Sequence, residues 1–231
     1  MKRIKLSAVI PVYNSGSILH ETYRHVKQAL SKITGDYEIL FRNDGSTDES
    51  QQVLERIAKS DKHVRIFRNE NHGLGFVLRR MFKDARGDII IYLDADAYMT
   101  FGLSQLPNLI EKAKEADAII ASRYMQGRIP LHRFVPSRTY KIINMALFGM
   151  GIDDIGSGFV VFKKSALDRI KLYSDGFEIH IEIYTKLHKA GFRVIEVPTD
   201  YVHWDEGSFK MLKHGPRTLA MTLKYWLKGG G

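Results

Sequence analysis

The chain has 231 residues and a mass of 26.5 kDa, which suits one large α/β domain or two small ones. Its 35 lysines and arginines against 26 aspartates and glutamates give a formal net charge of +9, which favours polyanionic partners such as nucleotide phosphates, nucleic acid or an anionic membrane surface. The lack of cysteine excludes a disulfide scaffold, a thiolate zinc site and a cysteine nucleophile.

No secretory signal is visible at the start of the sequence. The longest charge-free apolar stretch, residues 142–152, is shorter than the roughly 20 residues that span a bilayer. We therefore expect a cytoplasmic protein that is soluble or peripheral at the cytoplasmic face of a membrane.

Short β-rich runs alternate with helical patterns through the first half of the chain. This alternation predicts an α/β fold with a mostly parallel central sheet flanked by helices. The expected strands are residues 7–10, 38–41, 64–67, 89–93 and 118–121, and the expected helices include residues 19–30, 53–57, 75–85 and 106–113.

The pattern changes after Ser122. Gly127, Pro130 and Pro136 mark residues 123–136 as a loop. We expect helices over 137–148 and 179–190, strands over 159–162 and 194–197, and a basic helix at the end. The sequence thus predicts one compact domain over residues 1–210, followed by a basic amphipathic helix over residues 211–231.

Two carboxylates, Asp94 and Asp96, follow the most strand-like run of the chain. Ligands of open α/β sheets bind beyond the carboxyl ends of the strands. Because residues two apart on a strand point to the same side, we expect the two carboxylates to converge and repel each other. A divalent cation relieves that repulsion and can also hold a diphosphate. In the alternative interpretation, one aspartate caps the next helix and the other is solvated.

A stretch without any carboxylate runs from Ala118 to Ile152 and carries five cations that no nearby acid opposes. Arginine forks bind phosphate oxygens through two parallel hydrogen bonds. The position of the stretch after the carboxylate pair predicts an anion site, with a solvated basic face as the alternative. The cations are Arg123, Arg128, Arg133, Arg138 and Lys141.

Signatures of several other proteins are missing. There is no phosphate-loop Gly-Lys-Ser/Thr and no His-Glu-x-x-His zinc motif, and Leu78 stands where a dinucleotide fingerprint from Gly73 requires glycine or alanine. The Gly-rich N-terminal signature of a nucleotidyltransferase is missing too. No nucleic-acid module is found, so we expect no nucleic-acid partner. A non-catalytic nucleic-acid-binding module remains the alternative from another class.

A series of short motifs runs from about residue 6 to residue 210. These motifs lie at residues 7–14, 38–48, 71–75, 87–88, 93–96, 122–124, 133, 137–138, 154–159, 196–198 and 207–208. Their ordered set resembles the family 2 glycosyltransferases, and within them the polyprenol-phosphate (dolichol-phosphate) mannose and glucose synthases. Each motif is weak alone, but the set is specific.

The resemblance implies a GT-A fold, in which residues 1–210 form a single Rossmann-like catalytic domain. It also implies a GDP- or UDP-linked sugar donor, a Mn²⁺ or Mg²⁺ ion, and inversion at the anomeric carbon. The implied acceptor is a polyprenyl or dolichyl phosphate, with a sugar hydroxyl as the alternative. By position, the resemblance implies nucleoside contacts for Pro11, Tyr13, Asn14 and Asp44, and phosphate contacts for Arg123, Arg133 and Arg138. It places Asp94 near the ribose or the metal and makes Asp96 the direct metal ligand.

The sequence departs from the family pattern at three positions. Ser15 stands where the family often has glutamate, Asn43 where it has a second aspartate, and Tyr98 where some mannose synthases have glutamine. These departures leave the base and the sugar of the donor open.

The need for a general base depends on the acceptor. A lipid phosphate is already an anion, whereas a sugar hydroxyl requires a carboxylate that takes its proton. The candidates are Asp153, Asp154 and Glu182. In the alternative interpretation, Asp154 fixes the Gly-rich turn through backbone hydrogen bonds and Glu182 lies on a solvated helix face.

The last segment predicts a helix that begins at Gly215-Pro216. On a helical wheel its basic residues, Arg217, Lys224 and Lys228, lie opposite an apolar arc of Leu219, Leu223, Trp226 and Leu227. This pattern is typical of a helix at an anionic membrane surface. The alternative is a terminal helix docked on the domain by those same apolar residues.

Overall fold

The computed structural model describes residues 5–124, 131–202 and 211–230. Within these residues, seven strands form one sheet in the order β3-β2-β1-β4-β6-β5-β7. All neighbouring strands run parallel except β6, which is antiparallel to both β4 and β5. The strands are β1 Leu6–Val12, β2 Tyr37–Asp44, β3 Val64–Asn69, β4 Ile89–Leu93, β5 Ala118–Ser122, β6 Phe159–Lys163 and β7 Val194–Pro198.

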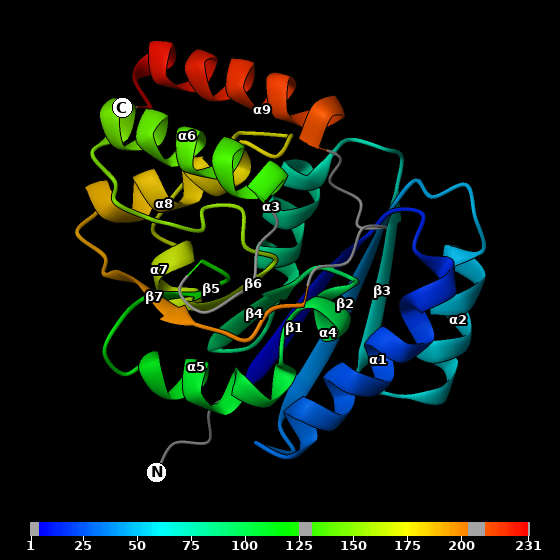
Figure 1. Cartoon of the computed structure of the whole chain (residues 1–231). Coiled ribbons are helices and arrows are strands. Elements are labelled where there is room, and N and C mark those ends of the chain that lie inside the picture. The colour runs from blue at the N-terminus through cyan, green and yellow to red at the C-terminus, as the bar shows by residue number, and fades with distance from the viewer. Residues whose placement is uncertain (1–4, 125–130, 203–210, 231) are drawn as a thin grey trace.

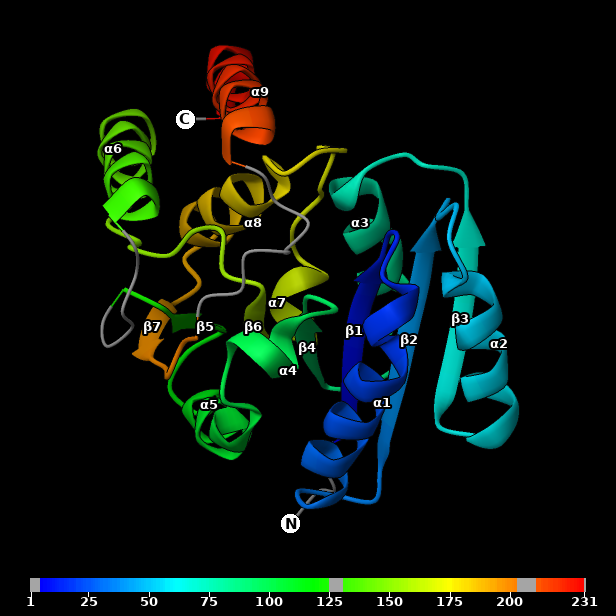
Figure 2. The ribbon, with the colours of Figure 1, turned by 45° about the vertical axis from the view of Figure 1, so that its right-hand side comes forward.

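Helices cover both faces of this sheet, as Figures 1 and 2 show. This arrangement confirms the predicted α/β class with a mostly parallel sheet. The helices are α1 Gly16–Ser31, α2 Ser50–Ser60, α3 Leu74–Asp84, α4 Ala97–Thr100, η1 Leu103–Gln105, α5 Leu106–Lys112, α6 Leu131–Phe148, α7 Lys164–Leu167, α8 Ile179–Lys189 and α9 Met211–Tyr225, followed by the π-helical turn η2 Trp226–Gly230.

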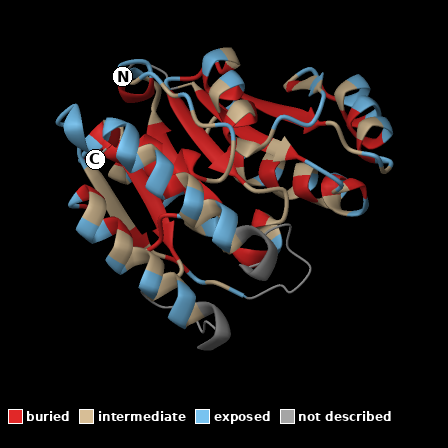
Figure 3. Ribbon diagram, turned by 90° about the horizontal axis from the view of Figure 1, so that it is seen from above, coloured by how far each residue is buried: buried red, intermediate tan, exposed pale blue. Residues whose placement is uncertain are grey.

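The two faces of the sheet pack into separate hydrophobic cores. On β4, Ile89, Ile91 and Leu93 belong to the core that α1, α2 and α5 cover, whereas Ile90 and Tyr92 belong to the core that α3 and α8 cover. A strand buried on both faces has to be apolar at every position. Figure 3 shows the strands buried and the helices exposed on their outer sides. Burial on both sides explains why residues 89–93 form an unbroken apolar run.

The strand order reverses between β1 and β4. From β1 the chain continues to β2 and β3 on one side, and β4 then pairs with β1 on the other side. A crevice opens at the carboxyl ends of the strands at such a switch point, where the loops separate to opposite faces. Asp44 ends β2, and Asp94 directly follows β4.

Two predicted boundaries are wrong for the same reason. The helix expected to begin at residue 137 begins at Leu131, and the helix expected to begin at Gly215-Pro216 begins at Met211. Both helices continue through a proline, Pro136 in α6 and Pro216 in α9. A proline inside a helix removes one backbone hydrogen bond and usually kinks or ends the helix, which is why the sequence pattern placed a boundary at each of them.

Within the described part of the chain, no helix is both long enough and apolar enough to cross a membrane.

Candidate active site

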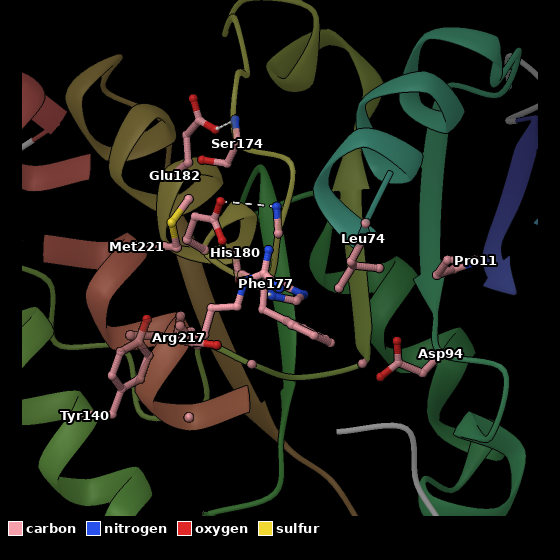
Figure 4. A pocket seen from close by; sticks show the side chains of 18 of the residues that line it. Pro11, Leu74, Asp94, Tyr140, Ser174, Phe177, His180, Glu182, Arg217 and Met221 are labelled. Carbon is pink, nitrogen blue, oxygen red and sulfur yellow. Dashed lines mark hydrogen bonds between the residues drawn. The ribbon is translucent and has the colours of Figure 1, made fainter. Parts of the chain in front are cut away.

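A pocket of about 2210 Å³ lies over the carboxyl ends of β1, β2 and β4. It continues past α3 and α8 to the helices α6 and α9. Pockets for one small ligand usually measure about 300–1,000 Å³, so this volume can hold two reactants. Figure 4 shows Pro11 and Asp94 at one end of the pocket and Tyr140, Arg217 and Met221 at the other.

Two loops are joined at the β1 end of the pocket. The Asn14 side-chain oxygen accepts a hydrogen bond from the backbone N–H of Thr47 at 2.8 Å, and the Asn14 N–H donates to the Ser46 hydroxyl at 2.9 Å. Asn14 has a φ of 48°, a left-handed conformation that asparagine tolerates better than most residues. The adjoining Pro11 and Tyr13 line the pocket, and Tyr13 is 47% exposed. The predicted nucleoside residues therefore lie together here.

Asp44 lies buried at the end of β2 and fixes the loop that leads into α3. Its carboxylate accepts hydrogen bonds from the backbone N–H groups of His72 at 3.0 Å and Gly73 at 2.9 Å, and from the Asn69 amide. It also lines the pocket beside Asn14. The predicted contact between Asp44 and the base stays a prediction, and the structure adds a loop-positioning role.

Asp94 and Asp96 both line the pocket, but the reason given from the sequence is wrong. β4 ends at Leu93, so the two residues lie in a turn, with Asp96 directly before α4. The Tyr92 hydroxyl donates to the Asp94 carboxylate at 2.6 Å, and the Asp94 N–H donates to the Gly158 carbonyl at 2.8 Å. The two carboxylates are thus brought together by a turn held against β6 rather than by strand alternation.

The carboxylate pair fits a divalent cation. Burial raises the pKa of Asp96 to about 7, and the nearby Asp94 carboxylate adds to the shift. A hard cation with oxygen ligands removes that electrostatic conflict. Among the described residues, no group of three or more His, Asp or Glu side chains is placed to hold a metal. Two protein carboxylates plus substrate phosphates and water are, however, a usual ligand set for Mg²⁺.

Arg123 and Asp154 form a buried ion pair beside the carboxylate pair. Arg123 donates from Nε to Oδ2 of Asp154 at 2.8 Å, from Nη2 to Oδ1 at 2.6 Å and from its backbone N–H to Oδ2 at 2.9 Å. The guanidinium also donates to the Gly156 carbonyl at 3.0 Å and lies over the Tyr201 ring. Asp154 is 1% exposed. It holds Arg123 against the Gly-rich turn, and a proton-accepting role stays a prediction.

Arg138 and Lys141 share a second acid, Asp153. Both side chains donate to its Oδ1, Lys141 at 2.5 Å. The expectation that these cations stand unopposed is therefore wrong: the opposing acids come from the turn after α6. The side chain of Arg133 and the whole of Arg128 lie outside the described residues. Glu196 of β7 accepts the backbone N–H groups of Asp153 and Asp154 and so fixes both acids.

Glu182 is fully buried, so the alternative interpretation of a solvated helix face is wrong. Its carboxylate accepts the backbone N–H groups of Tyr173 and Ser174 and the ammonium of Lys186, at 2.5–3.1 Å. Burial alone would raise the pKa of Glu182, but these hydrogen bonds lower it overall. Figure 4 places Glu182 at the far side of the pocket from Asp94. It fixes the loop before α8, and a catalytic role stays a prediction.

Sequence reasoning missed three residues around Asp94. Tyr92 was counted only as part of an apolar strand, and His180 only as part of a predicted helix. Gly158 lies so close to Asp94 that a Cβ atom there would be 2.0 Å from Oδ2. In the sequence, the Gly156-Ser157-Gly158 motif indicates a tight turn, but it does not indicate that Gly158 contacts Asp94.

The structure is a doubly wound sheet with a carboxylate pair and arginines around its switch-point crevice, which is the arrangement that a GT-A fold requires. Residues 7–171 match the model of glycosyl transferase family 2. The chain therefore belongs to this family, as the sequence motifs predicted.

Two curated relatives are 30% identical to this chain. Glycosyltransferase AglD of Haloferax volcanii aligns over 210 residues, which cover 86% of this chain and 33% of the relative. Dolichol-phosphate mannosyltransferase of Pyrococcus furiosus aligns over 202 residues, which cover 84% and 56%. The chain thus spans about a third to just over half the length of these relatives.

A solved structure with the same fold is the mannosyltransferase PcManGT from Pyrobaculum calidifontis in complex with GDP-Man and Mn²⁺. The match has a TM-score of 0.66 and 17% sequence identity, and covers 96% of this chain and 62% of that one. At this identity the likeness supports the GT-A fold alone.

Proposed function

We propose that the protein is an inverting glycosyltransferase that moves a hexose from a GDP- or UDP-linked sugar to a polyprenyl or dolichyl phosphate. One observation carries the proposal: a single pocket joins the Asp94 and Asp96 carboxylates to the basic face of α9. The relative named dolichol-phosphate mannosyltransferase supports this choice of acceptor.

In this proposal the donor binds at the β1 end of the pocket. Pro11, Tyr13, Asn14 and Asp44 contact the nucleoside, and the diphosphate lies beside Asp94 and Asp96. A Mn²⁺ or Mg²⁺ ion held by these two carboxylates supplies positive charge to the leaving diphosphate, where negative charge develops. Arg123, Arg133 and Arg138 are proposed to stabilise donor or acceptor phosphates.

The acceptor end of the pocket is basic. Lys186 of α8 and Arg217, Lys224 and Lys228 of the C-terminal segment line it. The candidate bases Asp153, Asp154 and Glu182 are each held by a cation within the protein. A carboxylate that is already paired is a poor proton acceptor, so an acceptor that arrives as an anion suits this site better than a neutral hydroxyl.

A membrane surface is proposed to supply this acceptor. Figures 1 and 2 show α6, α8 and α9 gathered at one end of the molecule. The C-terminal helix packs through Thr222, which shares a hydrogen bond with Tyr140 of α6, and through Tyr225, which stacks on Phe148. Three apolar side chains of its outer arc stay exposed: Leu223 by 40%, Trp226 by 41% and Leu227 by 75%.

The exposure of this arc supports the membrane interpretation over the alternative that these apolar residues dock the helix on the domain. Ile142 and Met145 of α6 add further exposed apolar surface. We propose that residues 1–210 form the catalytic domain and that residues 211–231 rest on the cytoplasmic face of the membrane, with basic groups towards the pocket and apolar groups towards lipid.

The test is transfer from a panel of GDP- and UDP-linked hexoses to a short-chain polyprenyl phosphate, with the anomer of the product determined by NMR. We expect one donor to be used, in the presence of Mn²⁺ or Mg²⁺, with inversion. Transfer only to a sugar hydroxyl would refute the acceptor, and full activity after chelation would refute the metal. Absence of nucleotide binding would refute the donor class.

A further inference from the structure

One buried imidazole in the pocket has an unused nitrogen. His180, on α8, is 7% exposed, and its Nδ1 lies 3.1 Å from the carbonyl oxygen of Phe177. Its Nε2 is buried and makes no hydrogen bond with any described residue. His180 lines the pocket, and in the view of Figure 4 it lies between Glu182 and Asp94.

The contact with Phe177 determines the tautomer. A carbonyl oxygen only accepts, so Nδ1 has to carry the proton. Burial lowers the pKa of His180, and the imidazole is therefore neutral near pH 7 and carries a single proton. Nε2 then carries a buried lone pair on a residue that lines the pocket, and it can only accept a hydrogen bond.

The chemistry of the reactants limits what Nε2 can accept from. A diphosphate and a lipid phosphate present acceptor oxygens, which a lone pair does not bind. A nucleotide sugar donates from the N–H groups of its base and from its hydroxyls. The base is proposed to lie at the β1 end of the pocket, and the hexose carries most of the hydroxyls. His180 also lies beside the carboxylate pair, because its ring is 5.8 Å from that of Tyr92, whose hydroxyl binds Asp94. The hexose is bonded to the diphosphate, which is proposed to lie beside Asp94 and Asp96, so the hexose must lie near this carboxylate pair.

We propose that Nε2 of His180 accepts a hydrogen bond from a hydroxyl of the donor's hexose and thereby contributes to the choice of sugar. This inference rests on the proposed function, since it assumes a nucleotide-sugar donor in the pocket. A buried acceptor with no other partner discriminates strongly, because a sugar that lacks the matching hydroxyl leaves it unsatisfied.

Two substitutions separate the nitrogens of His180. The amide nitrogen of His180→Asn can replace Nδ1 and keep the hydrogen bond to Phe177, but the side chain is too short to replace Nε2. The amide oxygen of His180→Gln can reach the position of Nε2. Tyr184→Phe is the matched control, because its hydroxyl is also buried on α8 and has no hydrogen-bond partner among the described residues, but Tyr184 does not line the pocket.

The measurement is calorimetric binding with Mn²⁺ of the nucleotide sugar that the wild type prefers, and of the corresponding nucleoside diphosphate. We expect His180→Asn to weaken binding of the nucleotide sugar about tenfold and to leave the nucleoside diphosphate unchanged. His180→Gln should recover most of the loss, and Tyr184→Phe should bind both ligands like the wild type.

Two outcomes would overturn the inference. Equal loss for both ligands would place the contact on the ribose or on the fold. Full binding by His180→Asn would mean that Nε2 meets no hydroxyl and that only the structural bond to Phe177 matters. Neither outcome affects the proposed function while the wild type still binds the nucleotide sugar. Failure of the wild type to bind any nucleotide would refute the proposed function instead.

Discussion

Replacement of Gly158 by alanine should disable the carboxylate pair while leaving the fold in place. A Cβ atom at this position would lie 2.0 Å from Oδ2 and 2.4 Å from Cγ of Asp94. Ordinary contacts between carbon and oxygen begin at about 3.4 Å, so the carboxylate has to move by about 1.4 Å. That movement would also break the 2.6 Å hydrogen bond from the Tyr92 hydroxyl.

A displacement of this size is expected to cost about 100-fold in turnover, because a shift of about 1 Å in a positioned group has that effect on catalysis. Metal-dependent nucleotide binding should weaken in parallel. The assay is donor turnover with Mn²⁺, together with calorimetric titration of the nucleoside diphosphate and a thermal unfolding scan.

Gly156→Ala is the matched control in the same turn. No atom lies within 4 Å of the Cβ that it would add, and Gly156 has no left-handed φ. Its turnover and midpoint of unfolding should equal those of the wild type. Wild-type turnover in Gly158→Ala would refute the placement of Asp94 at the reacting centre. Loss of cooperative unfolding in that variant would show that the clash acts on the fold, and Asp94→Asn would then test the carboxylate directly.

Other predictions follow from single contacts. Asp96→Asn should abolish metal-dependent transfer and raise the unfolding midpoint slightly, since it removes carboxylate repulsion; unchanged transfer would contradict a metal role. Asp154→Ala leaves the half-buried Arg123 guanidinium without its carboxylate partner and should cost about 2 kcal/mol of unfolding free energy in denaturant titration. Burial alone would raise the pKa of the Asp61 carboxyl, but hydrogen bonds from groups such as Lys27 lower that pKa overall. Asp61→Asn should therefore lower the free energy of unfolding at pH 7. The difference in this free energy between variant and wild type should shrink as the pH falls below about 4. Leu227→Glu should reduce co-sedimentation with anionic vesicles without changing nucleotide affinity, and equal sedimentation would refute the proposed membrane face.

The sheet and the position of the site could be predicted from the sequence. Apolar runs such as residues 89–93 mark the buried parallel strands, and the carboxyl ends of those strands locate the crevice. Both signals are local, because a strand that is buried on both faces has apolar side chains at consecutive positions. The position of Asp94 and Asp96 follows from this argument, whereas the role of Asp44 follows only from the family resemblance.

The partners of the charged residues were decided only by the tertiary structure. Arg123 meets an acid 31 positions later, and Arg138 meets one 15 positions later, each beyond the reach of any local pattern. From the sequence alone, a solvated helix face was one interpretation of Glu182. The residue is in fact buried, because the loop before α8 folds back onto it and the Ser174 N–H donates to its carboxylate.

What the sequence alone determined is therefore the succession of strands and helices along the chain, the acidic residues at the strand ends and the family. What the tertiary structure decided is which groups are already satisfied and which, like Nε2 of His180, are not. The physical reason is that burial and pairing depend on distances between segments remote in the chain, whereas strand and helix signals arise from neighbouring residues.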